Sequence, residues 1–342
     1  MPLTYTPRKR FSPQEYAQAI LAGDRIMLSR AITLIESKLP SDVALAEKVL
    51  EIILPHTGNS LRVGITGVPG VGKSTFIESF GKLITGMGKK LAVLTIDPSS
   101  QRSKGSILGD KTRMESLAND PMAYIRPSAS GATLGGVNNK TRETMLLCEA
   151  AGYEVILIET VGVGQSETTV AEIADFFLLL MLAGAGDELQ GIKKGIMEMA
   201  DALVITKADG DNVTMSQMAA REYANAMRLF PAQDSGWEPE VLTCSSVEQR
   251  GLDAVWDVIV RHHELMCQTG YFQAKRMEQN IAWMNEIIDY YLKYDFLHAP
   301  AVSEVLDFTQ HQVESGKLPA ITAAKRLLER FRGEGAKGTD GK

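Results

Sequence analysis

The sequence contains few cysteines, no excess of positive charge and no long apolar run. Its three cysteines, Cys148, Cys244 and Cys267, lie far apart and match neither a CxxC metal pattern nor a disulfide framework. This usage is typical of a reducing compartment, so we expect a cytoplasmic protein. The formal net charge of -6 argues against a nucleic-acid partner, because such proteins normally carry a basic excess.

The longest apolar run, residues 176–186, is too short to span a membrane and is typical of a core strand. No apolar segment follows the basic N-terminus, so no secretory signal and no membrane partner are expected. The chain has 342 residues, of which 44% are hydrophobic and 23% are charged. It is therefore long and apolar enough to bury a full core.

Residues 1–58 are predicted to form a helical N-terminal extension. Within residues 13–55, apolar side chains recur at three- and four-residue spacings, at Tyr16, Ile20, Leu28, Ile32, Ile35 and Leu39. A second helix is expected after Pro40, with Ser41 as its N-cap.

Residues 59–266 are predicted to form an α/β domain. Short apolar runs alternate with helical segments; the runs are residues 61–66, 91–97, 123–127, 153–159, 176–182, 201–206 and 240–244. They lack polar alternation, which indicates strands covered on both faces. The helices between them favour right-handed crossovers and a doubly wound, mostly parallel sheet.

Residues 267–332 are predicted to form a helical C-terminal tail. Its large apolar side chains, among them Trp283, Ile287, Tyr290 and Leu292, need a surface to cover. The tail either packs back on the sheet or builds a homodimer. The glycine- and charge-rich residues 333–342 are expected to be disordered.

A phosphate-binding loop is indicated by GVPGVGKST, which follows a predicted strand and opens a predicted helix. Its glycines let backbone N–H groups point at phosphate oxygens, next to the positive end of the helix dipole. Lys73 can reach the β- and γ-phosphates, and Ser74 can supply a hydroxyl to Mg²⁺. The predicted nucleotide-binding residues here are Gly67, Val68, Pro69, Gly70, Val71, Gly72, Lys73, Ser74 and Thr75. The segment thus predicts a P-loop NTPase fold.

Guanine rather than adenine is favoured by TKAD at the end of a later predicted strand. Asp209 can accept hydrogen bonds from the guanine N1–H and exocyclic amine, which adenine does not offer, and Lys207 can lie along the base. Cys244, Ser245 and Ser246 follow the next strand and would lie beside the base, with a backbone N–H facing guanine O6.

Magnesium and the γ-phosphate need carboxylates at other strand ends, because an open α/β sheet binds its ligand at the carboxyl edge. Asp97, Asp110 and Glu159 are available. Asp97 could instead be a turn residue before Pro98, and Asp110 a helix N-cap. Glu159 begins ETVG, which has the DxxG spacing of a γ-phosphate switch and places Gly162 where its N–H can reach the γ-phosphate.

The glycine-rich residues 128–143 have two possible roles. They either touch the nucleotide or a partner, or form a flexible loop before the next helix. His262 and His263 lie on an amphipathic helix with no cysteine or carboxylate at ligand spacing, so we predict no metal site there.

Several long motifs occur in an order that resembles a known family. They are GVPGVGKST from Gly67, DPSSQRSKGSILGDKTRM from Asp97, ETVGVGQSE from Glu159, AGAGDELQGIKKG from Ala183 and TKAD from Thr206. Together they resemble the MeaB/ArgK family of GTPases, G proteins associated with methylmalonyl-CoA mutase. The resemblance covers nearly the whole chain and implies a SIMIBI-type G domain with a helical dimerisation tail.

The resemblance also implies roles for individual residues. Glu159 would act on Mg²⁺ through a water, while Asp97 and Asp110 would flank the first switch, one near the metal and one orienting the attacking water. Residues 186–195 would form a third switch that reports the nucleotide state to the mutase, with Lys193 assisting hydrolysis. A Ras-type protein has a water-positioning glutamine after DxxG, but here Val163 occupies that position. Slow intrinsic hydrolysis, accelerated by a partner, is therefore expected.

The function implied by the resemblance is that of a homodimeric GTPase that uses GTP/GDP and Mg²⁺. It would bind an adenosylcobalamin-dependent acyl-CoA mutase, and either gate its cofactor loading or protect it. The cobalamin would belong to the partner, since no DxHxxG motif occurs here. The alternatives are a protein kinase linked to lysine, arginine and ornithine transport, and a metal-delivery G protein. The sequence shows no acceptor site for the first and no His-rich or clustered Cys segment for the second.

Overall fold

The computed structural model describes residues 11–96, 114–127, 136–160, 166–184, 194–231 and 233–337. The chain divides into two compact units, Met1–Gln279 and Asn280–Lys342, which are described separately.

The first unit is built on a seven-stranded sheet in the order β3-β2-β4-β1-β5-β6-β7. Every pairing between its strands is parallel, which confirms the predicted parallel sheet. The strands are β1 (Leu61–Gly67), β2 (Leu91–Ile96), β3 (Ala123–Pro127), β4 (Val155–Thr160), β5 (Phe176–Leu182), β6 (Ala202–Thr206) and β7 (Glu240–Thr243). Strands β1 and β4 are buried along their whole length, and β5 is buried up to its last residue, because helices cover both faces.

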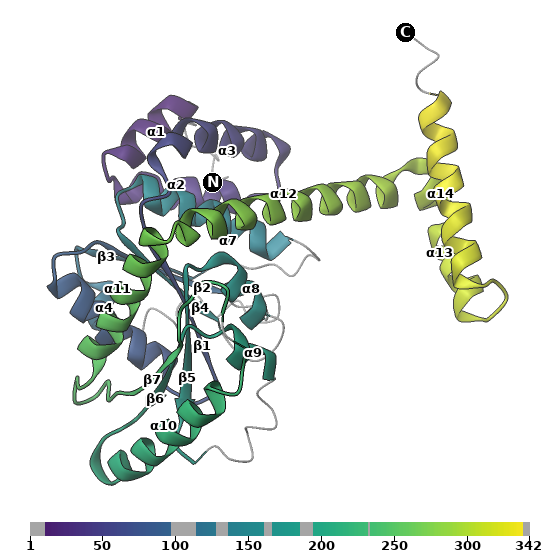
Figure 1. Cartoon of the computed structure of the whole chain (residues 1–342). Helices are drawn as coiled ribbons and strands as arrows, with labels where there is room; N and C mark the ends of the chain where they lie inside the picture. The colour runs from purple at the N-terminus through teal and green to yellow at the C-terminus, as the bar shows by residue number, and fades with distance from the viewer. Residues whose placement is uncertain are drawn as a thin grey trace, which may run out of the picture. The chain divides into compact units, whose positions relative to one another are not determined.

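Helices cover the two faces of the sheet as the doubly wound prediction requires (Figure 1). One face carries α4 (Lys73–Gly86), α6 (Glu115–Ala118) and α11 (Leu252–Gln268). The other carries α7 (Gly136–Ala150), α8 (Ser166–Ile173), α9 (Lys194–Met199) and α10 (Val213–Met227), the last preceded by the short η3 (Gly210–Asn212). Met181 and Met197 are buried in the core, and Met199 packs against it partly buried.

The N-terminal extension consists of α1 (Pro13–Leu21), α2 (Arg25–Glu36), α3 (Pro40–Ile53) and the short η1 (Leu54–His56), and it packs on α7. The first predicted helix is broken after α1. Gly23 adopts a left-handed conformation with φ 77°, and the Asp24 side chain caps α2 by accepting from the backbone N–H groups of Ile26 and Met27. The apolar side chains of α1 and α2 follow one helical spacing in the sequence, which is why the sequence predicts a single helix.

The prediction that Ser41 caps the next helix is wrong. Helix α3 begins at Pro40, and its N-cap is Leu39. Proline suits the first helical position because its fixed φ is helical and its missing N–H would have no partner there. Leu39 is also 58% exposed, so it does not belong to the apolar stripe to which we assigned it.

The amino edge of the sheet anchors the long helix α12 (Tyr271–His298). The Arg276 guanidinium binds Asp175 with both ends of its fork, from Nη2 to Oδ2 at 2.6 Å and from Nε to Oδ1 at 2.9 Å. It also donates to the carbonyls of Gly58 and Ser60, and Asp175 accepts from the N–H of Arg62 at the start of β1. One buried arginine therefore joins α12 to two strands of the sheet.

The second unit contains the remainder of α12 together with α13 (Pro300–Glu314) and α14 (Ala320–Lys337). Helices α13 and α14 pack against each other, and Phe331 of α14 meets Phe296 of α12 edge to face at 5.4 Å between ring centroids. Helix α14 continues beyond Arg332, where we placed the end of the helical tail, and residues 338–342 lie outside the described part of the chain.

Candidate functional site

The segment between β1 and α4 forms a tight loop at the carboxyl edge of the sheet. At Gly67 a Cβ atom would lie 2.4 Å from the Leu180 carbonyl oxygen, so only glycine fits beside β5. Gly72 has φ 91° and directly precedes α4, whose first turn receives no side-chain cap. The uncapped N–H groups of that turn, at the positive end of the helix dipole, are suited to bind phosphate oxygens.

The side chains of Lys73 and Ser74 project from the start of α4 toward different neighbours. Lys73 Nζ donates to the Gly67 carbonyl at 2.8 Å, across the loop that it closes. Ser74 Oγ donates to Glu159 Oε1 at 3.4 Å. The contact exists because β4, which carries Glu159, pairs with β1 on the side opposite to β5.

Glu159 is 4% exposed and lies next to the last residue of β4. The following residue, Thr160, shares a hydrogen bond at 2.9 Å with Thr66 of β1, which fixes the ends of the two strands relative to each other. Carboxylate and hydroxyl oxygens are the ligands that Mg²⁺ prefers, and Mg²⁺ takes only one or two from protein beside phosphate. Ser74 and Glu159 fit that donor set.

A second loop at the same edge follows β6 and contains Lys207, Ala208 and Asp209. Ser245 Oγ donates to Asp209 Oδ2 at 2.6 Å, and Ala208 N–H donates to the Cys244 carbonyl at 3.0 Å. The loops after β6 and β7, which the sequence analysis assigned to the guanine base, are thus bound together. Ser246 follows directly and is partly exposed.

The thiol of Cys244 stays neutral in this environment. Burial, together with the nearby charge of Asp209, raises its pKa to about 12. Cys244 therefore contributes a backbone carbonyl and packing volume, and not a thiolate.

The phosphate-binding loop is tied directly to the loop after β6. Lys207 adopts a left-handed conformation with φ 55°, and its Nζ donates to the Gly70 carbonyl at 2.8 Å. Thr206 Oγ1 donates to the Val71 carbonyl at 2.8 Å. A non-glycine residue in this conformation is strained, and such strain is concentrated at ligand-binding positions.

A glycine loop between a strand and a helix is thus bonded to a second loop at the same edge of the sheet. The family model for Methylmalonyl Co-A mutase-associated GTPase MeaB matches residues 28–301. The chain belongs to the MeaB family of GTPases. Its enzymatic activity is GTP hydrolysis.

The relatives of this MeaB-family GTPase extend over most of its length. GTPase ArgK of Escherichia coli K12 is 48% identical over 272 residues, which cover 80% of this chain and 82% of ArgK. A mitochondrial methylmalonic aciduria type A homolog of Mus musculus is 43% identical over 334 residues, covering 95% of this chain and 80% of the mouse protein. The crystal structure of an LAO/AO transport system kinase superposes with a TM-score of 0.76 at 37% identity, covering 96% of this chain and 100% of that one.

Four residues assigned to the site of the MeaB-family GTPase lie outside the described residues: Asp97, Asp110, Gly162 and Lys193. Most of the predicted third switch also lies there, and so do residues 128–135 of the glycine-rich segment. The other predicted residues, in the loops after β1, β6 and β7 and at Glu159, lie at the carboxyl edge of the sheet.

The sequence did not predict a role near this site for two residues, Ser79 and Arg250. Ser79 Oγ of α4 donates to the Ser246 carbonyl at 2.9 Å, and the Arg250 guanidinium donates to the Ala208 carbonyl. Both contacts join segments that are distant along the chain. The only local signal is Gly251, which follows Arg250 and marks a tight turn before α11.

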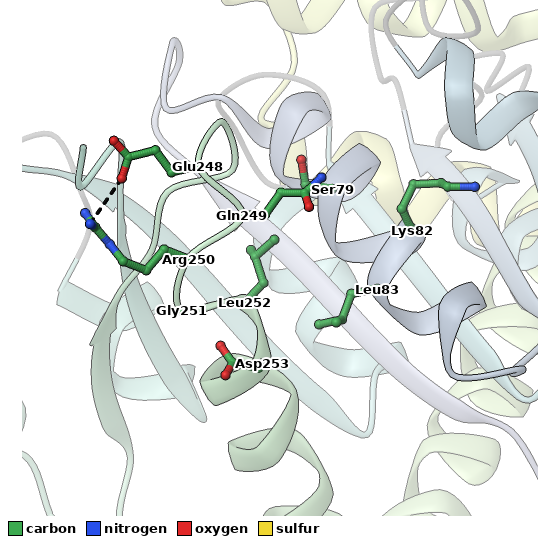
Figure 2. Close-up of a pocket in the computed structure, with 9 residues that line it drawn as sticks. All are labelled: Ser79, Lys82, Leu83, Glu248, Gln249, Arg250, Gly251, Leu252 and Asp253. Carbon is green, nitrogen blue, oxygen red and sulfur yellow. Dashed lines mark ion pairs between the residues drawn. The ribbon is translucent and has the colours of Figure 1, made fainter. Parts of the chain in front are cut away.

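A cavity of about 580 Å³ lies between α4 and the loop that follows β7. Figure 2 shows Ser79, Lys82 and Leu83 of α4 on one side, facing residues 248–253 on the other. Lys82 is paired with Asp120 at 2.6 Å, and Arg250 with Glu248 at 3.1 Å. The cavity thus borders the loop after β7 on the side of α4.

His262 is buried on α11 between the rings of Phe176 and Trp237, each of which meets it edge to face at 5.0 Å between centroids. Burial lowers its pKa to about 3. Within the described residues, no three His, Cys, Asp or Glu side chains are grouped to hold a metal ion. No helix in those same ranges is both long and apolar enough to cross a membrane.

Proposed function

We propose that this GTPase is a chaperone of an adenosylcobalamin-dependent mutase of the methylmalonyl-CoA type, and that it gates cofactor loading or protects the mutase. The proposal is carried by membership of a family described as mutase-associated, over residues 28–301. A relative covering 95% of this chain is named for methylmalonic aciduria, which supports the same partner.

GTP would bind along the carboxyl edge of the sheet. The loop of residues 67–75 would hold the phosphates through its N–H groups, and Lys73 would exchange its contact with the Gly67 carbonyl for the β- and γ-phosphates. Asp209 would accept from the guanine N1–H and amine, with Lys207 along the base and Cys244, Ser245 and Ser246 beside it. The hydrogen bond from Ser245 to Asp209 supports this assignment, because it orients the carboxylate.

Magnesium would be held by Ser74, with Glu159 acting through a water and with Asp97 and Asp110 nearby. The adjacency of Ser74 and Glu159, at 3.4 Å, supports this donor set. When bound, the ion neutralises charge that develops on the phosphoryl oxygens. Gly162 would offer its N–H to the γ-phosphate, and Lys193 would assist hydrolysis.

Intrinsic hydrolysis would be slow, because Val163 stands where a water-positioning glutamine is usual. The mutase would then accelerate turnover by reshaping residues near the γ-phosphate. A slow, partner-controlled GTPase is suited to act as a timer. We also propose a cytoplasmic location, in keeping with three cysteines that are all free thiols.

The helical tail would form a homodimer. On α12, Ile281, Met284, Ile288 and Tyr291 recur at three- and four-residue spacing and are 56%, 49%, 46% and 50% exposed. This spacing is that of a coiled-coil seam, and four exposed apolar side chains in one row are suited to pack on an identical row.

The test is co-purification of the full chain with an adenosylcobalamin-dependent methylmalonyl-CoA mutase, in GDP and in a non-hydrolysable GTP analogue. We expect a complex whose affinity differs between the two nucleotides. The mutase should also raise the rate of GTP hydrolysis. Absence of a complex in both nucleotide states would exclude the chaperone function while leaving GTP hydrolysis intact.

A second candidate function is phosphoryl transfer to a protein. The solved structure with a TM-score of 0.76 is titled as a transport system kinase, which favours this candidate. Incubation with GTP labelled at the γ-phosphate separates the two. The chaperone function predicts free phosphate, whereas a kinase would leave label on protein.

A further inference from the structure

The residues that follow Ser245 form a closed loop behind the base-reading segment. Ser245 N–H donates to the Arg250 carbonyl at 2.9 Å, and Arg250 N–H donates to the Ser245 carbonyl at 3.0 Å. Inside the loop, Glu248 N–H donates to Ser245 Oγ at 3.0 Å. Ser245 Oγ also donates to Asp209, so the geometry of this loop determines where the Asp209 carboxylate lies.

Arg250 closes the loop a second time through its side chain. One guanidinium nitrogen donates to the Ala208 carbonyl, and the other pairs with Glu248 Oε2 at 3.1 Å (Figure 2). Ala208 directly precedes Asp209, and its own N–H is bound by the Cys244 carbonyl. Ala208, the residue before Asp209, is therefore held through its N–H by the Cys244 carbonyl and through its own carbonyl by Arg250.

The backbone of this loop is strained in a way that indicates a fixed geometry. Gln249 and Lys207 are the non-glycine residues with positive φ among the described residues, at 51° and 55°. At Gly251 a Cβ atom would lie 2.5 Å from the Thr243 carbonyl oxygen. Such conformations persist only where surrounding contacts hold them, and the Arg250 guanidinium supplies contacts on both sides of the turn.

Helix α4 holds the loop from the opposite side. Ser79 Oγ donates to the Ser246 carbonyl at 2.9 Å, and so orients the peptide that follows Ser246. The cavity of about 580 Å³ lies between this part of α4 and residues 248–253 of the loop, and Ser79 is one of its lining residues. The position of the loop consequently depends on a few polar contacts.

We propose that Arg250 is a positioning residue for guanine recognition. The inference rests on the assignment of Asp209 to the base in the proposed function. Arg250 holds the Ala208 carbonyl, and through it places Asp209 where the carboxylate accepts from both N1–H and the exocyclic amine. A guanidinium suits this task because its fork bonds the carbonyl and Glu248 at the same time, which a lysine ammonium does less well.

The test compares GTP with ITP, which lacks the exocyclic amine, by measuring both dissociation constants for the full chain. Arg250→Ala should lower the ratio of GTP to ITP affinity by about fivefold to tenfold, as expected for a hydrogen bond from a charged group that is partly exposed. Arg250→Lys should lower it by a smaller factor. An unchanged ratio of GTP to ITP affinity would overturn the proposal, even if Arg250→Ala weakens the binding of both nucleotides.

Arg261→Ala is the matched control. Arg261 pairs with Glu240 at 2.8 Å, and its side chain is 56% exposed, the same fraction as Arg250. The control should leave the ratio unchanged. The thermal midpoints of the Arg250→Ala and Arg261→Ala proteins should agree, which separates positioning from a loss of fold.

Asp209→Asn distinguishes a failure of this inference from a failure of the proposed site. An amide can donate to the extra carbonyl of xanthine, so this variant should prefer XTP to GTP. If it does, and Arg250→Ala leaves the ratio of GTP to ITP affinity unchanged, only the role of Arg250 is refuted. If Asp209→Asn shows no such preference, the assignment of Asp209 to the base is refuted, and with it the role of Arg250.

Discussion

Ser74 Oγ donates to Glu159 Oε1 at 3.4 Å, and this contact joins the start of α4 to the end of β4. The two residues are far apart in sequence, and they meet because β4 crosses to pair with β1. The contact places a hydroxyl and a carboxylate together at the edge where the phosphates would lie. From this position we expect the Glu159 side chain to affect the rate of GTP hydrolysis more than the binding of GDP.

Glu159→Ala should lower the rate of GTP hydrolysis by about 100-fold, because it removes the charged group that we propose organises the metal. The dissociation constant for GDP should change little, since the phosphate loop remains intact. Hydrolysis assayed across a Mg²⁺ titration, with GDP binding measured separately, checks both statements. Unchanged hydrolysis would contradict the role of Glu159.

Lys73→Ala provides the contrasting variant. It should weaken the binding of GTP and GDP by about 100-fold, because a charge-assisted contact to the phosphates is lost. The two variants thus separate a loss of binding from a loss of turnover.

Arg276→Ala should lower the free energy of unfolding by about 3 to 5 kcal/mol, because it leaves the buried Asp175 carboxylate without its cation. Urea denaturation of the purified protein measures this change. Arg261→Ala, which breaks an exposed pair, should cost about 1 kcal/mol or less. Equal effects of the two substitutions would show that the Arg276 network contributes no more than a surface pair.

The stability of the protein should fall as the pH drops below about 6.5, the ordinary pKa of histidine. Burial lowers the pKa of His262 to about 3, so between these values the unfolded chain binds a proton that the folded chain does not. The cost is about 1.4 kcal/mol per pH unit in that window. Asp201, whose Oδ1 lies 3.8 Å from His262 Nε2, has a pKa raised by burial and opposes the trend at the acid end.

His262→Phe tests this origin of the pH dependence. The phenyl ring suits the apolar contacts with Phe176 and Trp237, and His262 Nδ1 has no hydrogen-bond partner among the described residues. Urea denaturation at pH 7 and pH 5 should show a smaller difference in unfolding free energy for His262→Phe than for the parent protein. The exposed His311→Gln variant should retain the parent difference. An equal difference in His262→Phe would assign the effect to other groups.

Ile288→Glu should convert the proposed homodimer to a monomer, because it places a charge in the middle of the apolar row on α12. Sedimentation velocity measures the mass. Lys293→Gln changes the net charge by the same single negative unit at an exposed position outside that row, and it should leave the dimer intact. A parent protein that sediments as a monomer would refute the dimer itself.

The sequence was sufficient to predict those parts of the fold whose signals are local. The strand of residues 61–67, the glycine loop and the helix from Lys73 follow one another directly, so their pattern can be read without knowledge of the rest. The apolar runs that became β2, β4, β5 and β6 are continuous because both faces of the sheet are covered there. The order of the strands, which brings Glu159 beside Ser74, has no such local signal.

The sequence led to a wrong prediction, or to none, where the structure depends on competing caps or on contacts between distant residues. Asp24 and Ser41 are both good capping residues by type, and only the position of Gly23 and the preference of Pro40 for the first helical turn determine which one caps a helix. Ser79 and Arg250 act on carbonyls of residues far away in sequence, and a carbonyl acceptor leaves no trace in the residue type.

The bonds from Lys207 to Gly70 and from Thr206 to Val71 have a thermodynamic consequence for ligand binding. They join the loop that we propose binds the base to the loop that we propose binds the phosphates. Ordering either loop therefore reduces the conformational entropy still to be lost at the other. Guanosine and inorganic triphosphate should therefore each bind far more weakly than their share of contacts suggests. The intact nucleotide gains a chelate advantage that neither fragment can recover.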